Sequence, residues 1–205
     1  MQLPAFDHAQ AIVLLKEKAK TPLSSADIAA KAHRRWDLNQ HPEAALLFCL
    51  AFERAHAEIA VQPDSTSQAP NYFVRAAINF NMAGEATTAE PMLTEVTQMD
   101  WQKLGLPNDS HMSEWAFEQL LLNQKTSAPA FAALFEQAVL RCRELGWEFP
   151  KIHPKQELLL QTAITLNLPT VVRRLVDLIL KRRPISRDTR NLLQSAESYL
   201  AQQAP

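Results

Sequence analysis

The sequence predicts an all-α protein in which about ten helices form antiparallel hairpins that stack on one another. Only three of the 205 residues are Gly, and residues with high helix propensity are abundant, which favours helices over tight β-hairpins. Almost no stretch alternates polar and apolar side chains as a half-buried strand does. A third observation is an apolar spacing that occurs four times along the chain. Together they predict one helical domain over residues 1–205.

The N-terminal helix is expected within residues 1–24. Asp7 opens a helical pattern that closes on three lysines, the polarity that a helix dipole favours, and Pro22 ends it. The apolar run at residues 11–15 is too short for a signal peptide or a membrane span. We therefore expect a cytoplasmic protein that does not cross a membrane.

The first hairpin is expected over residues 25–60. Ser24 and Ser25 are suitable N-caps for its leading helix. A polar break at residues 39–41 separates the two helices, and Pro42 falls in a first turn, where a missing N–H donor is tolerated. This is the clearest hairpin pattern in the chain.

Three more hairpins and a C-terminal capping helix follow. Gly84 provides the turn of one hairpin, and Gly146 is a suitable stop for a helix of another. Ser186 is expected to cap the last helix. The predicted hairpins span residues 70–100, 113–146 and 154–184, and the capping helix spans residues 186–203.

The trailing helix of each hairpin carries apolar residues at positions i, i+4 and i+7, which lie on one helical face. Successive copies of this pattern begin 45, 42 and 41 residues apart. Such a period predicts that each hairpin is one structural repeat whose apolar face packs on its neighbours. The residues at these positions are Ala44, Phe48 and Ala51; Ala89, Leu93 and Val96; Phe131, Phe135 and Ala138; and Val172, Val176 and Ile179.

With this pattern the chain resembles the tetratricopeptide-repeat family, whose unit is a helical hairpin of about 34 residues. The resemblance covers residues 25–185, although the connections are longer than in the family and Phe131 stands where a small residue is typical. It implies a right-handed solenoid of stacked hairpins. The matching residues are Ala32, Ala44, Phe48 and Ala51 in the first hairpin, and Ala77, Phe80, Gly84 and Ala89 in the second.

The resemblance also implies a concave surface, lined by the leading helices, that binds another protein or a peptide. We accordingly predict a non-enzymatic module: an adaptor, a chaperone-like protein or a bacterial immunity protein that neutralises a toxin. Neither a cofactor nor a bound metal is expected. The residues that the resemblance places on this surface are His33, Trp36, Val74, Ile78, Asn81, Leu120, Asn123, Glu157 and Gln161.

Basic residues are concentrated in the second half of the chain. Residues 1–102 hold eight Lys/Arg against twelve Asp/Glu, whereas residues 103–205 hold thirteen against ten. This excess leaves nucleic-acid binding through residues 173–190 as an alternative function, but a sequence pI near 6.6 disfavours it. The basic patch consists of Arg173, Arg174, Lys181, Arg182 and Arg183.

Two residue pairs leave a metal-assisted hydrolase as a further alternative. Glu53 and His56 have the Glu-x-x-His spacing of di-iron helical bundles, but the chain has no second copy of that motif. His33 and Asp37 are four residues apart on a predicted helix and could share a face. A solvated helix surface is the simpler explanation of both pairs.

The two cysteines and one tryptophan are expected to be part of the core. Cys49 and Cys142 fall in apolar helical patterns rather than in a spaced cluster, which predicts buried, reduced thiols instead of a disulfide or a redox site. Trp115 has Phe117 and Leu121 close by in a helical pattern and is expected to pack with them.

Overall fold

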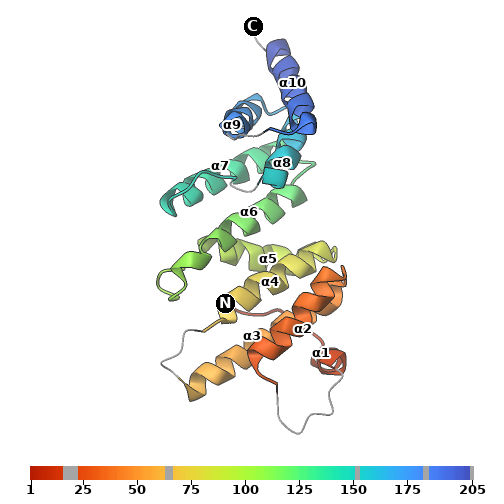
Figure 1. The fold of residues 1–205 in the computed structure, drawn as a ribbon, viewed down its shortest axis with the longest axis vertical. Helices are drawn as coiled ribbons and strands as arrows, with labels where there is room; N and C mark the ends of the chain where they lie inside the picture. Colours follow the sequence, from red (N-terminus) through yellow and green to blue (C-terminus); the bar gives the residue numbers. More distant parts are fainter. Residues whose placement is uncertain (16–22, 63–66, 151–152, 182–184, 204–205) are drawn as a thin grey trace. The chain divides into compact units, whose positions relative to one another are not determined.

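The structure, a computed structural model, describes residues 1–15, 23–62, 67–150, 153–181 and 185–203. These residues form ten α-helices and one short 3₁₀ helix, and they contain no strand (Figure 1). The prediction of an all-α protein is therefore confirmed.

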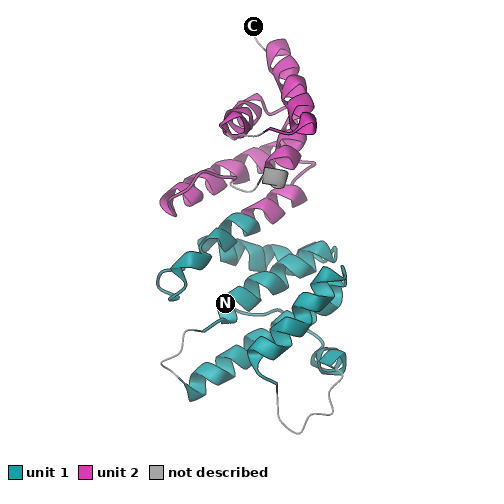
Figure 2. Ribbon diagram, in the orientation of Figure 1, with its two compact units in different colours: residues 1–116 teal, residues 117–205 magenta. Residues whose placement is uncertain are grey.

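Two compact units divide the chain, Met1–Ala116 and Phe117–Pro205 (Figure 2). The boundary falls inside helix α6 (His111–Asn123). The sequence predicts one domain over residues 1–205, and the structure divides the chain into these two compact units.

Unit 1 is built around helix α3, which packs against α2, α4 and α1. Helix α4 packs in turn against α5, so that α2, α3, α4 and α5 contact one another in the order of the chain. Each of these helices buries an apolar face on the next one, as expected of consecutive hairpins. The elements are α1 (His8–Leu15), α2 (Ser25–Asp37), α3 (His41–Val61), α4 (Ala69–Met82), α5 (Ala86–Gln98) and the 3₁₀ helix η1 (Pro107–Asp109).

Unit 2 has its own hydrophobic core, in which Phe131, Phe135 and Phe149 are almost completely buried. Helix α10 packs against both α8 and α9, which also pack on each other. A core of this kind is the main source of stability for a small helical unit. The helices after α6 are α7 (Ala128–Glu144), α8 (His153–Thr165), α9 (Pro169–Leu180) and α10 (Arg187–Gln202).

Polar caps begin two of the helices where the sequence predicts them. The hydroxyl oxygen of Ser24 accepts a 3.1 Å hydrogen bond from the backbone N–H of Asp27, and the Asp27 carboxylate accepts one from the N–H of Ser24. This reciprocal capping box satisfies N–H groups that lack helical partners. Ser186 caps α10 with its hydroxyl oxygen alone, which accepts a 3.1 Å hydrogen bond from the N–H of Thr189. Ser25 is the first residue of α2 rather than its cap.

Three hairpins close with the same turn. Asn39, Gly84 and Asn167 each adopt a left-handed backbone, with φ of 57°, 84° and 56°. In each turn the next residue donates its N–H to a carbonyl five residues back, over 2.8, 2.9 and 3.0 Å respectively, which is the Schellman arrangement. The α6–α7 connection differs, because no residue between Asn123 and Ala128 has a positive φ.

The repeated apolar positions face the core in every hairpin. Ala44, Ala89 and Val172 begin three copies of the pattern, and each lies five residues after the left-handed turn residue, Asn39, Gly84 or Asn167. All twelve residues of the pattern are buried, as the sequence predicts. The predicted continuation of the first helix into residues 16–20 lies outside the described residues.

Candidate functional site

Four aromatic side chains gather in unit 1: His33 and Trp36 from α2, Phe48 from α3 and Trp115 from the first half of α6. We call these four residues the aromatic cluster. The Trp36 and Trp115 rings stack with centroids 5.4 Å apart, and the His33 and Trp36 rings are nearly parallel at 6.1 Å. Phe48 meets His33 at 5.0 Å and Trp36 at 6.1 Å, both edge to face. These are the geometries that aromatic pairs prefer.

Helical spacing explains why the cluster forms. His33 and Trp36 are three residues apart, so they lie on the same face of α2 and project over the trailing helix. Phe48 is completely buried beneath them, whereas His33, Trp36 and Trp115 are only half-buried. The sequence predicts Trp115 in the core, and the structure corrects this, because its ring packs on Trp36 with one part still accessible.

The electrostatic environment keeps the His33 ring neutral near pH 7. Burial lowers the pKa of His33 below its ordinary value, the nearby Arg75 guanidinium lowers it further, and Asp37 opposes them with a weaker effect. Burial also lowers the pKa of Arg75. A neutral His33 leaves the cluster as an aromatic surface with the Arg75 guanidinium close enough to affect the His33 ring.

Three residues predicted to contact a partner are instead buried. Val74 and Ile78 have no exposed surface, and Leu120 is 8% exposed. Helix α4 packs against both α3 and α5, and 11 of its 14 residues are buried, so Val74 and Ile78 have no accessible face to point toward. These three predictions of surface residues are wrong.

The other predicted contact residues remain accessible. Asn81, Asn123 and Glu157 are half-buried, and Gln161 is exposed. Glu157 has a structural contact, because its carboxylate accepts a hydrogen bond from the Thr189 hydroxyl and so joins α8 to α10. Among the nine predicted residues, His33 and Trp36 lie together in the aromatic cluster.

Glu53 and His56, considered as metal ligands, each contact another residue. The Glu53 carboxylate lies 3.3 Å from Nε2 of His8, and the His56 ring packs edge to face on Phe52. The chain portions that the structure describes contain no group of three or more His, Cys, Asp or Glu placed to hold a metal ion. The geometry therefore gives the hydrolase alternative no support in the described part of the chain.

The predicted basic patch is divided among separate contacts. A guanidinium nitrogen of Arg174 lies 3.7 Å from the Glu136 carboxylate, and Lys181 lies 3.0 Å from that of Glu148. Arg173 is exposed. Arg182 and Arg183 lie outside the described residues. The described cations of this patch are thus largely matched by carboxylates.

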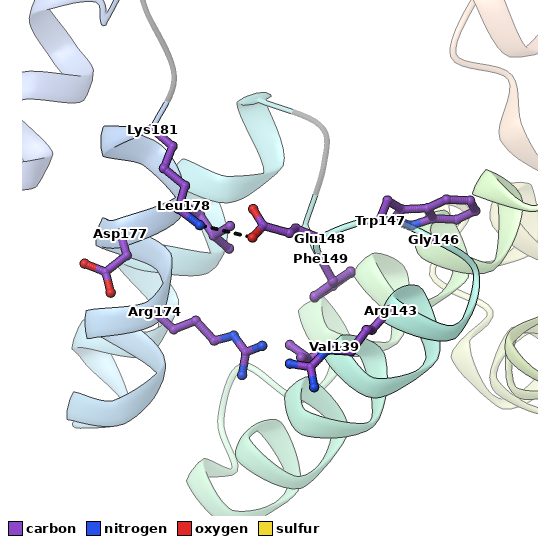
Figure 3. Close-up of a pocket in the computed structure, with 10 residues that line it drawn as sticks. All are labelled: Val139, Arg143, Gly146, Trp147, Glu148, Phe149, Arg174, Asp177, Leu178 and Lys181. Atoms are coloured by element: carbon purple, nitrogen blue, oxygen red, sulfur yellow. Dashed lines mark hydrogen bonds and ion pairs between the residues drawn. The ribbon is translucent and has the colours of Figure 1, made fainter.

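Unit 2 contains a pocket of about 600 Å³ between α7, α9 and the connection that follows Gly146 (Figure 3). Its described walls combine three cations, two carboxylates, four apolar or aromatic side chains and one glycine. Sequence reasoning missed it, because its residues come from segments far apart in the chain. The residues that line this pocket are Arg143, Arg174 and Lys181; Glu148 and Asp177; Val139, Trp147, Phe149 and Leu178; and Gly146.

Comparison with known proteins adds no family to these observations. No protein-family model matches the chain, and no curated protein or solved structure matches it. Among the residues that the structure describes, no helix combines the length and apolar character that a membrane span requires.

Proposed function

We propose that this protein is a non-enzymatic binding module, built from tetratricopeptide-like helical hairpins, that holds a partner protein or peptide through the aromatic cluster. The observation that carries the proposal is the half-buried pair Trp36 and His33, supported from below by the buried Phe48. Tryptophan on a well-packed base is the residue most enriched among the hot spots of protein interfaces.

Pre-organisation strengthens this argument. Trp36 packs against three other rings of the cluster before any partner binds. Its conformational freedom is already restricted, so a partner that covers it loses little additional side-chain entropy. Its remaining accessible surface then contributes to affinity as apolar area removed from water.

The repeat architecture is supported by the shared hairpin turns. Asn39, Gly84 and Asn167 hold equivalent left-handed positions, each five residues before the first buried residue of the apolar pattern. The consecutive packing of α2, α3, α4 and α5 is the arrangement that stacked repeats require. Rigid modules of this kind suit an adaptor, a chaperone-like protein or a toxin-neutralising immunity protein.

The test compares variants of the immobilised full chain in capturing proteins from an extract of its source organism. Trp36→Ala is expected to lose a protein that the wild type retains, and Trp36→Phe to recover part of the binding. Val61→Ala is the control, because Val61 is 80% exposed and lies 13 residues, or about 20 Å, beyond Phe48 along α3.

The affinity of each variant for the purified partner then tests whether Trp36 is a hot spot. A loss of about 2 kcal/mol or more for Trp36→Ala, with no change for Val61→Ala, would agree with a hot spot. Equal capture by all three variants would refute the role of the cluster. Substrate turnover by the purified protein, abolished in a variant of Asp37 or His56, would refute the non-enzymatic assignment.

A further inference from the structure

We propose that the pocket of unit 2 binds a small organic acid, with its carboxylate between Arg143 and Arg174 and its apolar body on Val139, Phe149 and Leu178. This site is distinct from the aromatic cluster of unit 1, so it does not depend on the proposed protein-binding function. It assigns a ligand class to a cavity that the sequence alone does not reveal.

The geometry that points to an anion is the convergence of two guanidinium groups. Arg143 projects from α7 and Arg174 from α9, and Figure 3 shows the two side chains extending toward one another from opposite walls of the pocket. Both groups are positively charged at any physiological pH, so their convergence is unfavourable unless an anion lies between them. A planar carboxylate can accept paired hydrogen bonds from such a guanidinium fork.

Local carboxylates leave this positive charge only partly balanced. Arg143 has no ion pair among the described residues, and Arg174 has only the 3.7 Å contact with Glu136, outside the pocket. Lys181 and Glu148 pair with each other over 3.0 Å at the edge of the pocket (Figure 3). Both arginines therefore keep hydrogen-bond donors for a ligand.

The charge balance selects a ligand with one negative charge. Among the described lining residues, three cations, Arg143, Arg174 and Lys181, stand against two carboxylates, Glu148 and Asp177, and Glu136 outside the pocket lies 3.7 Å from Arg174, so the pocket carries at most one net positive charge. A second negative charge on the ligand would be repelled by Asp177 and Glu148. A monocarboxylate fits this balance better than a phosphate monoester.

Apolar side chains provide a surface for the rest of the ligand. Val139, Phe149 and Leu178 are 4%, 2% and 8% exposed, so they form a well-packed apolar floor of small accessible area. Small-molecule sites combine such a floor with a few converging polar groups, in volumes of about 300–1,000 Å³. A short alkyl chain or a ring next to the carboxylate would be covered here.

Glycine resonances provide a direct measurement of binding. The chain has only three glycines, so protein labelled with [¹⁵N]glycine gives three amide signals. Gly146 lines the pocket, whereas Gly84 and Gly105 lie in unit 1 and serve as internal references. Gly84→Asn and Gly105→Asn assign the signals, because asparagine tolerates the positive φ of both positions.

The probes are sodium hexanoate, hexanol and inorganic phosphate at constant ionic strength. Hexanoate is expected to shift the Gly146 signal saturably and to leave the two references unchanged, while hexanol and phosphate bind at least about tenfold more weakly. N-acetylglutamate N-methylamide carries the same carboxylate on a peptide-like body. Stronger binding of hexanoate assigns a free acid with an apolar body, and stronger binding of the glutamate derivative overturns that part of the proposal.

Arginine variants then test the geometry. Arg143→Gln and Arg174→Gln are each expected to weaken hexanoate binding by about tenfold or more. Arg173→Gln is the matched control for Arg174→Gln, since Arg173 is an exposed arginine of α9 that is not among the residues lining the pocket. Unchanged helical circular dichroism shows that each variant is folded. Absence of a Gly146 shift, or equal weakening by Arg173→Gln, would overturn the proposal.

Discussion

Truncation of Phe48 is expected to destabilise unit 1 strongly, because this residue supports the aromatic cluster from within the core. Its side chain is completely buried and makes edge-to-face contacts with His33 and Trp36. Phe48→Ala removes these contacts and leaves a cavity. Phe48→Leu removes the ring contacts but retains most of the apolar volume, so the two variants separate the two effects.

The expected magnitudes follow from these contacts. Replacing a buried Phe by Ala costs about 3–5 kcal/mol of unfolding free energy. Each aromatic pair contributes about 0.5–1.5 kcal/mol beyond its buried area, so loss of two pairs predicts about 1–3 kcal/mol for Phe48→Leu. Leu38→Ala is the control: Leu38 is 67% exposed at the end of α2, and its truncation is expected to cost less than about 0.5 kcal/mol.

Urea unfolding followed by tryptophan fluorescence measures these differences. In a Trp147→Phe background the three remaining tryptophans, Trp36, Trp101 and Trp115, all lie in unit 1. The urea concentration at the unfolding midpoint should be highest for Leu38→Ala, lower for Phe48→Leu and lowest for Phe48→Ala. Unfolding free energies of both Phe48 variants within about 0.5 kcal/mol of the parent would refute the packing on which the cluster depends.

Two further predictions concern titratable groups in unit 1. Because the pKa of His33 is lowered in the folded protein, the unfolded chain binds a proton at this residue at a higher pH than the folded chain does. The contribution of neutral His33 to the free energy of unfolding is therefore complete above the ordinary pKa of 6.5 and is lost as the pH falls through the folded pKa. Urea unfolding at pH 8 and pH 5 should therefore show a smaller loss for His33→Gln than for the wild type, and equal losses would contradict this account. Burial, followed by the negative charges of Glu53 and Glu85, raises the pKa of the Cys49 thiol to about 12. Iodoacetamide at pH 8 should thus label Cys49 only after denaturation, as measured by mass spectrometry, and rapid labelling of the folded protein would show that this thiol is accessible.

Local chemistry explains why the helices and several of their ends could be predicted from the sequence. A cap such as Ser24 and a turn residue such as Gly84 act on backbone groups a few positions away, so the sequence contains the whole interaction. The buried positions of the i, i+4, i+7 pattern also follow from helix periodicity. The equivalence of Asn39 and Asn167 with Gly84 was less visible, because a non-glycine residue can also adopt the left-handed conformation.

Exposure was harder to predict, because it depends on how many neighbours a helix has. The repeat pattern predicts Val74 and Ile78 on a surface, but α4 packs against both α3 and α5 and leaves these two residues no access to solvent. The periodicity of α6 predicts Trp115 in the core, whereas the structure leaves its ring half-buried and stacked on Trp36 of α2. Neither result can be obtained from the periodicity of one helix.

The sequence by itself determined the helical class, the hairpin breaks and the apolar faces, because these depend on propensity, capping and periodicity within short segments. Only the tertiary structure decided which side chains meet. His33 and Trp36 come from one helix, but Phe48 and Trp115 complete their cluster from two others. Arg143 and Arg174 likewise face one pocket from separate helices, because packing, rather than sequence distance, sets the separation of their side chains.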